Sequence, residues 1–200
     1  MTIFRRAAAL LSLAALSAGL TGCVAPVGPV EVTRFHVPSA PLGRGAITVE
    51  PAPGVDGASL EYRSYAAAVA RQLVLIGYSE QAAGTAPQIA QVRLSRSSYQ
   101  PGREGSPVSV GVGGSTGSYG GGVGLGVGID LSGPPPVQVD TELSVTIKDR
   151  ASGQSLWEGR SRFTVSAKSP LAQTQLGAAK MAEALFEGFP GRSGETIQVK

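Results

Sequence analysis

The sequence predicts an α+β protein: a two-layer sandwich in which two helices pack on one face of an antiparallel-rich sheet, with a glycine-rich hairpin insertion. Several segments alternate apolar and polar residues, which is typical of strands with one buried face. Two longer segments carry a single apolar stripe at helical spacing. Thirteen of the 28 glycines fall between residues 102 and 133. One-sided helices and one-sided strands can bury each other in a single core, so the first two patterns fit together.

Two short strands and a helix are expected first. The segments 33–37 and 46–50 contain β-branched residues and are bounded by proline and glycine, as short strands are. The helix is expected from Ser59, and Gly77 ends it because glycine readily takes the left-handed conformation that closes helices. Its apolar stripe, at spacings of three and four, consists of Tyr62, Tyr65, Val69, Leu73 and Ile76.

Three more strands and a second helix complete the prediction. Residues 90–95 and 137–148 alternate strictly, and a turn at 149–153 leads into a return strand. The return strand has Trp157, Phe163 and Val165 on one side and Glu158, Arg160 and Arg162 on the other. Ser169 and Pro170 form a helix start signal, and Gly188, Pro190 and Gly191 form a stop signal. The stripe between them is Leu171, Ala178, Ala182, Leu185 and Phe189. Residues 196–199 are expected to add a last edge strand.

Three segments together resemble one bacterial family. They are TELSVTIKDRASGQSLWEGRSRF at 141–163, YRSYAAAVARQLVLIGY at 62–78 and AAKMAEALFEGFPG at 178–191. The sequence is similar to the bacterial lipoprotein family called domain of unknown function 4136. The resemblance covers most of the chain after residue 23. It implies the fold and the cellular location, and it implies no activity.

The start of the chain has the features of an export signal. Arg5 and Arg6 precede an apolar run at 7–20 that is too short to span a bilayer, which takes roughly 20 apolar residues. Leu20-Thr21-Gly22-Cys23 then resembles the bacterial lipoprotein signal. That resemblance implies cleavage between Gly22 and Cys23 and lipidation of the Cys23 sulfur. Val24, where inner-membrane lipoproteins typically carry aspartate, implies delivery to the outer membrane.

These signals divide the chain into three parts. Residues 1–22 are the expected signal peptide, 23–33 a lipidated tether, and 34–200 a single α+β domain with the glycine-rich insertion at 102–133. The formal net charge of +3 falls close to neutrality once Arg5 and Arg6 leave with the signal peptide. The remaining basic residues are scattered, which argues against a nucleic-acid partner. Cys23 is the only cysteine, so no disulfide is available to stabilise the core.

The glycine-rich insertion has a second pattern within it. Valine, leucine and isoleucine recur at every second position in 108–112 and again in 123–131. Two such runs predict a long hairpin with one aliphatic face. The candidate interaction surface on that face is Val123, Leu125, Val127 and Ile129. It would dock envelope proteins or the membrane surface, or self-associate with a second copy; the alternative is a mobile insertion, because glycine raises the entropic cost of ordering.

Candidate catalytic residues each have a simpler explanation. Ser115 lies in a G-x-S-x-G pattern, but within a glycine-rich stretch and not at a strand-to-helix turn. His36 is the only histidine, and a surface position on a strand is expected for it. Asp140 and Glu142 share one strand face, where pairing with Arg160 and Arg162 is expected. The insertion contains no phosphate-binding glycine motif.

The sequence therefore predicts a non-catalytic, outer-membrane-anchored periplasmic lipoprotein that serves as a binding or assembly module of the cell envelope. No catalytic residue, cofactor or metal site is expected. One alternative is a hydrolase of an envelope polymer that uses Asp140 and Glu142 as paired carboxylates. A second alternative is a carrier of an apolar ligand, held in a cavity beside the small residues Ala66, Ala70 and Ala178.

Overall fold

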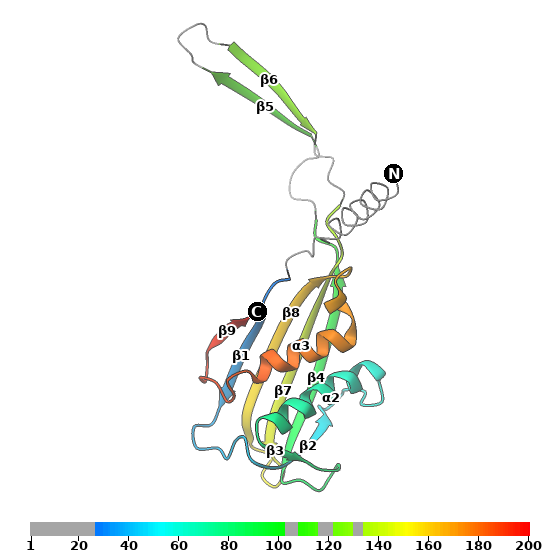
Figure 1. Cartoon of the computed structure of the whole chain (residues 1–200), viewed down its shortest axis with the longest axis vertical. Coiled ribbons are helices and arrows are strands. Elements are labelled where there is room, and N and C mark those ends of the chain that lie inside the picture. Colours follow the sequence, from blue (N-terminus) through cyan, green and yellow to red (C-terminus); the bar gives the residue numbers. More distant parts are fainter. Residues whose placement is uncertain (1–26, 103–107, 116–121, 130–133) are drawn as a thin grey trace, which may run out of the picture.

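The computed structural model describes residues 27–102, 108–115, 122–129 and 134–200, with the backbone alone described for the two middle segments. Seven strands form the main sheet, in the spatial order β3-β2-β4-β7-β8-β1-β9 (Figure 1). Their bounds are β1 Val30–His36, β2 Gly45–Pro51, β3 Tyr78–Glu80, β4 Gln88–Tyr99, β7 Gln138–Asp149, β8 Ser155–Ser166 and β9 Thr196–Val199. The predicted α+β fold is confirmed.

The sheet is antiparallel from β4 across β7, β8 and β1 to β9, whereas β2 runs parallel to both β3 and β4. The parallel pair β2 and β4 is connected through a helix, which is how parallel neighbours are usually joined. Strand β3 has three residues and was not expected from the sequence, since so short a run carries no readable alternation.

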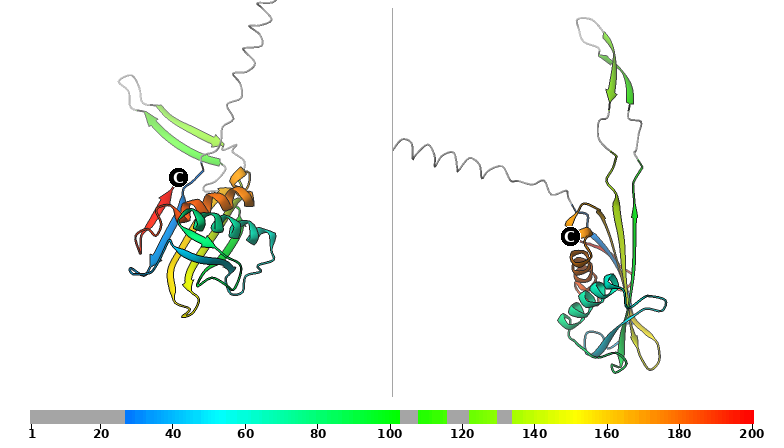
Figure 2. Two further views of the ribbon diagram at one scale, coloured as in Figure 1. Left: turned by 60° about the horizontal axis from the view of Figure 1, so that its bottom comes forward. Right: turned by 90° about the vertical axis from the view of Figure 1, so that its right-hand side faces the viewer.

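Two helices, α2 (Leu60–Leu75) and α3 (Thr174–Phe186), lie on the same face of the sheet (Figure 2). The helix α2 begins where the sequence predicts, because the Ser59 hydroxyl accepts a hydrogen bond from the backbone N–H of Tyr62 at 3.5 Å. It ends at Leu75, and Gly77 follows the C-cap residue Ile76 with a φ of +110°, which only glycine adopts without strain. The four residues Tyr62, Tyr65, Val69 and Leu73 of its predicted stripe are buried.

The second helix differs from its prediction at both ends. Ser169 caps a short 3-10 turn, η2 (Pro170–Ala172), and α3 itself begins only at Thr174. The turn folds back closely onto α3, since a Cβ at Gly177 would lie 2.9 Å from the Leu171 carbonyl oxygen. The start signal was therefore correct for a helical turn and wrong for the α-helix. Phe189 lies beyond the end of α3 and still packs against the core.

Strand β1 corrects the predicted boundary between tether and domain. It begins at Val30, inside the segment 23–33 assigned to the tether, and Val30 and Val32 are fully buried. The reason is their alternation with Glu31 and Thr33, which continues the pattern of the strand upstream of the predicted start. Strand β9 then pairs with β1 at the sheet edge, from Val30 opposite Val199 to Thr33 opposite Thr196.

The core lies between the sheet and the two helices. The predicted inward positions of β8 are buried, and so are those of β7 from Val139 to Ile147. Val137 was also predicted to face the core, but it precedes β7 and is exposed. The largest fully buried side chains of the core include Trp157, Tyr65, Ile47, Leu73, Leu143, Ile147, Met181 and Leu185. The opposite face of the sheet carries no helix among the described residues (Figure 2).

The glycine-rich insertion contains a separate two-stranded sheet of β5 (Val108–Ser115) and β6 (Gly122–Ile129), paired antiparallel from Val108 opposite Ile129 to Ser115 opposite Gly122. It lies beyond the end of the main sheet where β4 ends and β7 begins (Figure 1). The residues 103–107, 116–121 and 130–133 of the insertion lie outside the described residues.

Candidate interaction surfaces

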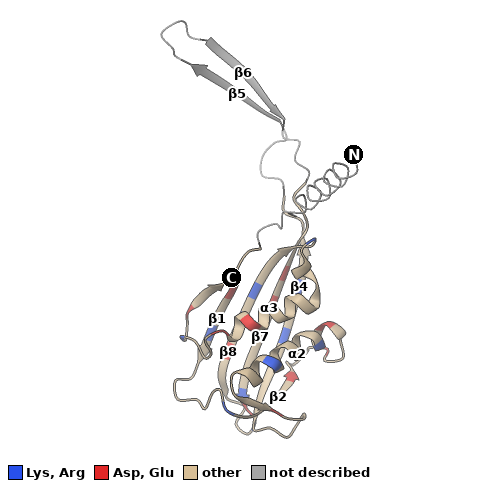
Figure 3. Ribbon diagram, in the orientation of Figure 1, with Lys and Arg blue, Asp and Glu red and all other residues tan. Residues whose placement is uncertain are grey.

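The outer face of the sheet carries a ladder of ion pairs on β7 and β8. Arg160 Nε lies 3.3 Å from Glu142 Oε1, and Arg162 Nε lies 3.5 Å from Asp140 Oδ2. The Thr164 hydroxyl also donates a hydrogen bond to Asp140 Oδ1 at 2.8 Å. Figure 3 shows basic and acidic residues on these neighbouring strands. The predicted cross-strand charge ladder is confirmed.

This pairing bears on the paired-carboxylate hypothesis. Both carboxylates lie on a sheet face beside arginines whose side chains are more than half exposed. A pair of carboxylates that acts on a polymer has to line a pocket that holds the substrate, whereas these two are paired with arginines on one face of the sheet. The arrangement therefore favours a solvated ladder over an acid–base pair.

A shallow hollow of about 140 Å³ lies next to the ladder on the same face. Its lining comes from β1, β7 and β8: Thr33, Phe35, Ser144, Thr146, Glu158, Gly159 and Arg160. Phe35 is 52% exposed there, which is unusual for a phenylalanine on a strand. Sequence reasoning placed a strand at this position and did not single out Phe35.

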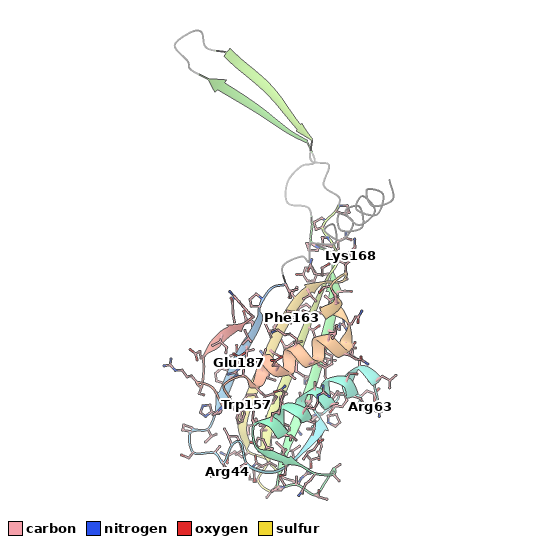
Figure 4. All side chains as sticks on the ribbon, in the orientation of Figure 1. Arg44, Arg63, Trp157, Phe163, Lys168 and Glu187 are labelled. Carbon is pink, nitrogen blue, oxygen red and sulfur yellow. The ribbon has the colours of Figure 1, made fainter. Side chains whose placement is uncertain are left out.

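Trp157, labelled in Figure 4, is the centre of an aromatic cluster between β8 and the end of α3. Its ring stacks on Phe186 at a centroid distance of 5.4 Å and tilts against Phe189 at 5.2 Å. The indole N–H donates a hydrogen bond to the Pro190 carbonyl oxygen at 3.0 Å. The segment that follows α3 is thereby fixed to the sheet, which explains why Phe189 behaves as a core residue although it lies outside the helix.

Arg34 is a buried cation that the sequence analysis missed. It is 4% exposed and donates a hydrogen bond to the Ala184 carbonyl oxygen, near the C-terminal end of α3, at 2.9 Å. Burial lowers the pKa of its guanidinium, and the nearby Glu187 and Glu195 oppose that shift. Arg34 lies on the same strand face as Val30 and Val32. This alternation in the sequence could have indicated that Arg34 is buried. A cation at the negative end of the helix dipole stabilises α3.

His36 ends strand β1 and is half-buried. Its ring Nε2 lies 3.2 Å from the Gly191 carbonyl oxygen. This position agrees with the expected strand histidine near the surface. No group of three histidine, cysteine, aspartate or glutamate side chains within the described parts of the chain is arranged to hold a metal ion.

Arg96 joins four elements at the end of the helix layer. It lies on β4 and donates hydrogen bonds to Glu61 Oε1 of α2 at 2.7 Å and to the Thr174 hydroxyl of α3 at 3.1 Å. It also donates to the Ala172 carbonyl oxygen of η2. The sequence prediction of this strand stopped at Ser95, so Arg96 was not placed on it. The strand runs on to Tyr99 because its polar residues still pair with β7.

The small residues considered for an apolar cavity lie in two environments. Ala178 is 1% exposed and belongs to the packed core. Ala70 borders a surface hollow on the outside of α2 together with Ala67, Arg71, Val74, Leu75 and Glu80. Ala66 is partly buried and packs against the core, so Ala66, Ala70 and Ala178 do not share one environment.

The candidate interaction residues Val123, Leu125, Val127 and Ile129 occupy alternate positions of β6. The register places them opposite Gly114, Val112, Val110 and Val108 of β5, respectively. Ser115, the serine of the G-x-S-x-G pattern, ends β5 opposite Gly122. Gly22 and Cys23 lie outside the described residues, so the lipidation and cleavage predictions rest on the sequence. Within the described residues, no helix has the length and apolar character that crossing a membrane requires.

Comparison with known families gives the chain its classification. A family model described as "Domain of unknown function (DUF4136)" matches residues 47–191. The chain belongs to this family. The match runs from β2 to the segment after α3, so the DUF4136 region contains both helices, the aromatic cluster and the ion-pair ladder, while β1 and β9 flank it. The resemblance noted in the sequence is thus confirmed.

Individual relatives are more distant. An uncharacterized protein of Zymomonas mobilis is 35% identical over 63 residues, which are 32% of this chain and 24% of that protein. The chain therefore covers about a quarter of that relative's length. Among solved structures, a PDZ domain protein from Parabacteroides distasonis matches with a TM-score of 0.48 and 8% identity, over 86% of this chain and 39% of that chain. The PelC dodecamer from Paraburkholderia phytofirmans matches with a TM-score of 0.42 and 12% identity, over 78% of this chain and 96% of that chain.

Proposed function

We propose that this DUF4136 protein is an outer-membrane-anchored lipoprotein whose body faces the periplasm and serves as a non-catalytic binding or assembly module of the cell envelope. The observation that carries the proposal is Leu20-Thr21-Gly22-Cys23, placed directly after a short apolar run with Arg5 and Arg6 before it. An acylated cysteine holds a protein at a bilayer when it carries two or more chains, since each buried CH₂ contributes about 0.8 kcal/mol.

The start of β1 supports a short connection between anchor and body. Cys23 and Val30 are seven residues apart, and seven residues span at most roughly 25 Å even when fully extended. The described domain is therefore held next to the bilayer surface if Cys23 is acylated. A protein fixed so close to a membrane is suited to contacts with other membrane-bound components.

The non-catalytic part of the proposal is supported by the pairing of Asp140 and Glu142 with arginines. The charged outer face, with its hollow beside the exposed Phe35, offers a surface on which a partner can bind. Membership of a family of unknown function is compatible with a binding role and does not specify a partner.

The test is the fate of Cys23→Ser in a Gram-negative host. We expect the variant to lose incorporation of labelled palmitate, to keep its signal peptide or be cleaved elsewhere, and to leave the membrane fraction. Unchanged labelling and sedimentation with membranes would remove the basis of the proposal. Val24→Asp tests the destination, since aspartate after the cysteine is expected to retain the protein in the inner membrane, and Val24→Ala is its matched control.

A further inference from the structure

The two-stranded sheet β5–β6 has two unlike faces. Residues opposite each other in a ladder lie on the same face, and the faces alternate along each strand. The register therefore assigns one face to valine, leucine and isoleucine, apart from Gly114. The other face has only glycine and serine. The aliphatic face consists of Val108, Val110, Val112, Val123, Leu125, Val127 and Ile129.

The strands also lack the usual protection of an exposed sheet. Proteins guard exposed edges with lysine, other charges or proline within the strand. From residue 108 to residue 129 the sequence has no aspartate, glutamate, lysine, arginine or proline. A two-stranded ribbon is at best marginally stable in water without a surface to cover its apolar face. We therefore expect the aliphatic face of β5–β6 to be covered by an apolar environment.

The insertion leaves the body at the same end as the N-terminal tether. Val27 and Gly28 border one hollow together with Pro136 and Gln138, the residues that lead from the insertion into β7. The same end carries Tyr99, the last residue of β4, which pairs with Gln138. Cys23 is four residues before Val27, a reach of at most roughly 14 Å. An anchored Cys23 brings the bilayer to this end of the molecule.

The size and composition of the face favour lipid over a second protein. Eight-residue strands are about 27 Å long, and two paired strands are about 10 Å wide, so the face measures on the order of 270 Å². A stable protein interface takes roughly 800 Å² from each partner and is enriched in aromatic residues, methionine and arginine. The face has none of these residue types.

We propose that the aliphatic face of β5–β6 lies flat on the phospholipid surface of the membrane that holds the anchor, with the glycine face toward water. A ribbon on the surface keeps its unpaired edge groups near water and headgroups, whereas the hydrocarbon interior would leave them unsatisfied. The inference rests on the proposed lipid anchor for the position of the membrane. The experiment below replaces that anchor, so that the two ideas fail separately.

The lone cysteine makes a clean labelling experiment available. The mature chain with Cys23→Ser has no thiol, so Leu125→Cys and Gly126→Cys each place one polarity-sensitive fluorophore on adjacent residues of β6 that belong to opposite faces. A hexahistidine segment before residue 23 holds the protein on vesicles of phosphatidylethanolamine, phosphatidylglycerol and a nickel-chelating lipid. Near-UV circular dichroism of Trp157 checks that the body is folded.

The expected result is a blue shift at position 125 when vesicles are added, with several-fold stronger quenching by nitroxide lipids at 125 than at 126. Equal signals at the two positions would assign the segment to a mobile insertion and overturn the proposal. The absence of any vesicle-dependent change would overturn it as well. A shift at 125 that needs no vesicles and grows with protein concentration would assign the face to a second copy. A native chain without acyl groups would contradict the proposed function and leave this result unaffected.

Discussion

Gly159 shows how one residue determines the packing of the aromatic cluster. It lies on β8 two residues after Trp157, on the face that the helices cover. A Cβ at this position would lie 2.1 Å from one ring carbon of Trp157 and 2.8 Å from two others. The indole occupies the space that any other residue would fill. The Gly in the segment Trp157-Glu158-Gly159 is therefore required by its neighbour and not by its backbone angles.

We expect Gly159→Ala to displace Trp157 and to lower the free energy of unfolding by about 1–3 kcal/mol, as overpacking of a core does. Urea unfolding followed by the fluorescence of Trp157, the only tryptophan, measures both effects. Gly28→Ala is the matched control, because nothing lies within 4 Å of a Cβ there. Equal stability of the two variants would mean that the ring does not lie over Gly159.

At the scale of elements, Arg96 connects the beginnings of both helices to the sheet. Hydrogen bonds to charged groups contribute about 1.5–3 kcal/mol each in favourable settings. We expect Arg96→Ala to lower the free energy of unfolding by about 1.5–3 kcal/mol, measured by urea unfolding. The ion pair of Arg162 with Asp140 is more exposed, so Arg162→Ala is expected to cost less than about 1 kcal/mol. A larger loss from Arg162→Ala than from Arg96→Ala would contradict this assignment.

The tyrosines of α2 predict how stability depends on alkaline pH. Burial, with a smaller contribution from the charge of Glu50, raises the pKa of Tyr62 to about 12. Burial also raises the pKa of Tyr65. The folded state thus holds these protons more tightly than the unfolded chain. The protonated tyrosines therefore stabilise the folded state. Their contribution to the free energy of unfolding is fully present below the ordinary tyrosine pKa of 10.0 and is lost as the pH rises toward about 12.

We therefore expect the free energy of unfolding to fall between pH 10 and about 12, and to fall less steeply in Tyr62→Phe than in the natural chain. Urea unfolding at a series of pH values in this range gives the two slopes. Part of the slope should remain in Tyr62→Phe, since Tyr65 and Tyr78 shift in the same direction. Identical slopes would show that Tyr62 is accessible to hydroxide in the folded protein.

Element types were predictable from the sequence where alternation or helical spacing ran for long enough. The stripe of α2 and the two faces of β7 and β8 are examples. The proximity of Asp140 and Glu142 to Arg160 and Arg162 followed from the two strand faces. Boundaries were less predictable. The sequence predicted that the second helix starts at Pro170, but α3 starts at Thr174. The reason is the close contact of η2 with Gly177, which forms only in the folded protein and leaves no pattern in the sequence.

The hydrogen-bond partners of Arg34 and Arg96 were not predictable, although the strand parity of Arg34 could have indicated that it is buried. Both arginines lie on strands. A single sequence does not reveal that Arg34 contacts the end of α3, or that Arg96 contacts the starts of both helices. Phe35 has the same strand parity as Glu31 and Thr33, which places it on the outer face although phenylalanine is usually buried. Which set of alternate residues is buried depends on which face of the sheet the helices cover.

At the scale of the whole molecule, the insertion and the body are expected to be independent in stability. Strands β4 and β7 pair along their full length, from Gln88 opposite Asp149 to Tyr99 opposite Gln138, without any residue of the insertion. The cost of closing a loop changes slowly with its length, by about 0.6 kcal/mol for each doubling.

Deletion of residues 106–131 is therefore expected to change the free energy of unfolding of the body by less than about 1 kcal/mol. Urea unfolding and near-UV circular dichroism measure this. If Cys23 is acylated as proposed, the same variant should keep its membrane attachment and lose the contact of β5–β6 with lipid. Loss of the cooperative unfolding transition would show that the insertion belongs to the core.

The pairing of β9 with β1 has a practical consequence. Val199 lies opposite Val30, so the C-terminus emerges beside the entry of the tether. If Cys23 is acylated, an affinity tag or fluorescent fusion added after Lys200 would be pressed against lipid headgroups and compete with the insertion for space. The turn at 150–153 lies at the opposite end of the longest strands from the tether, so it is the better site for an epitope.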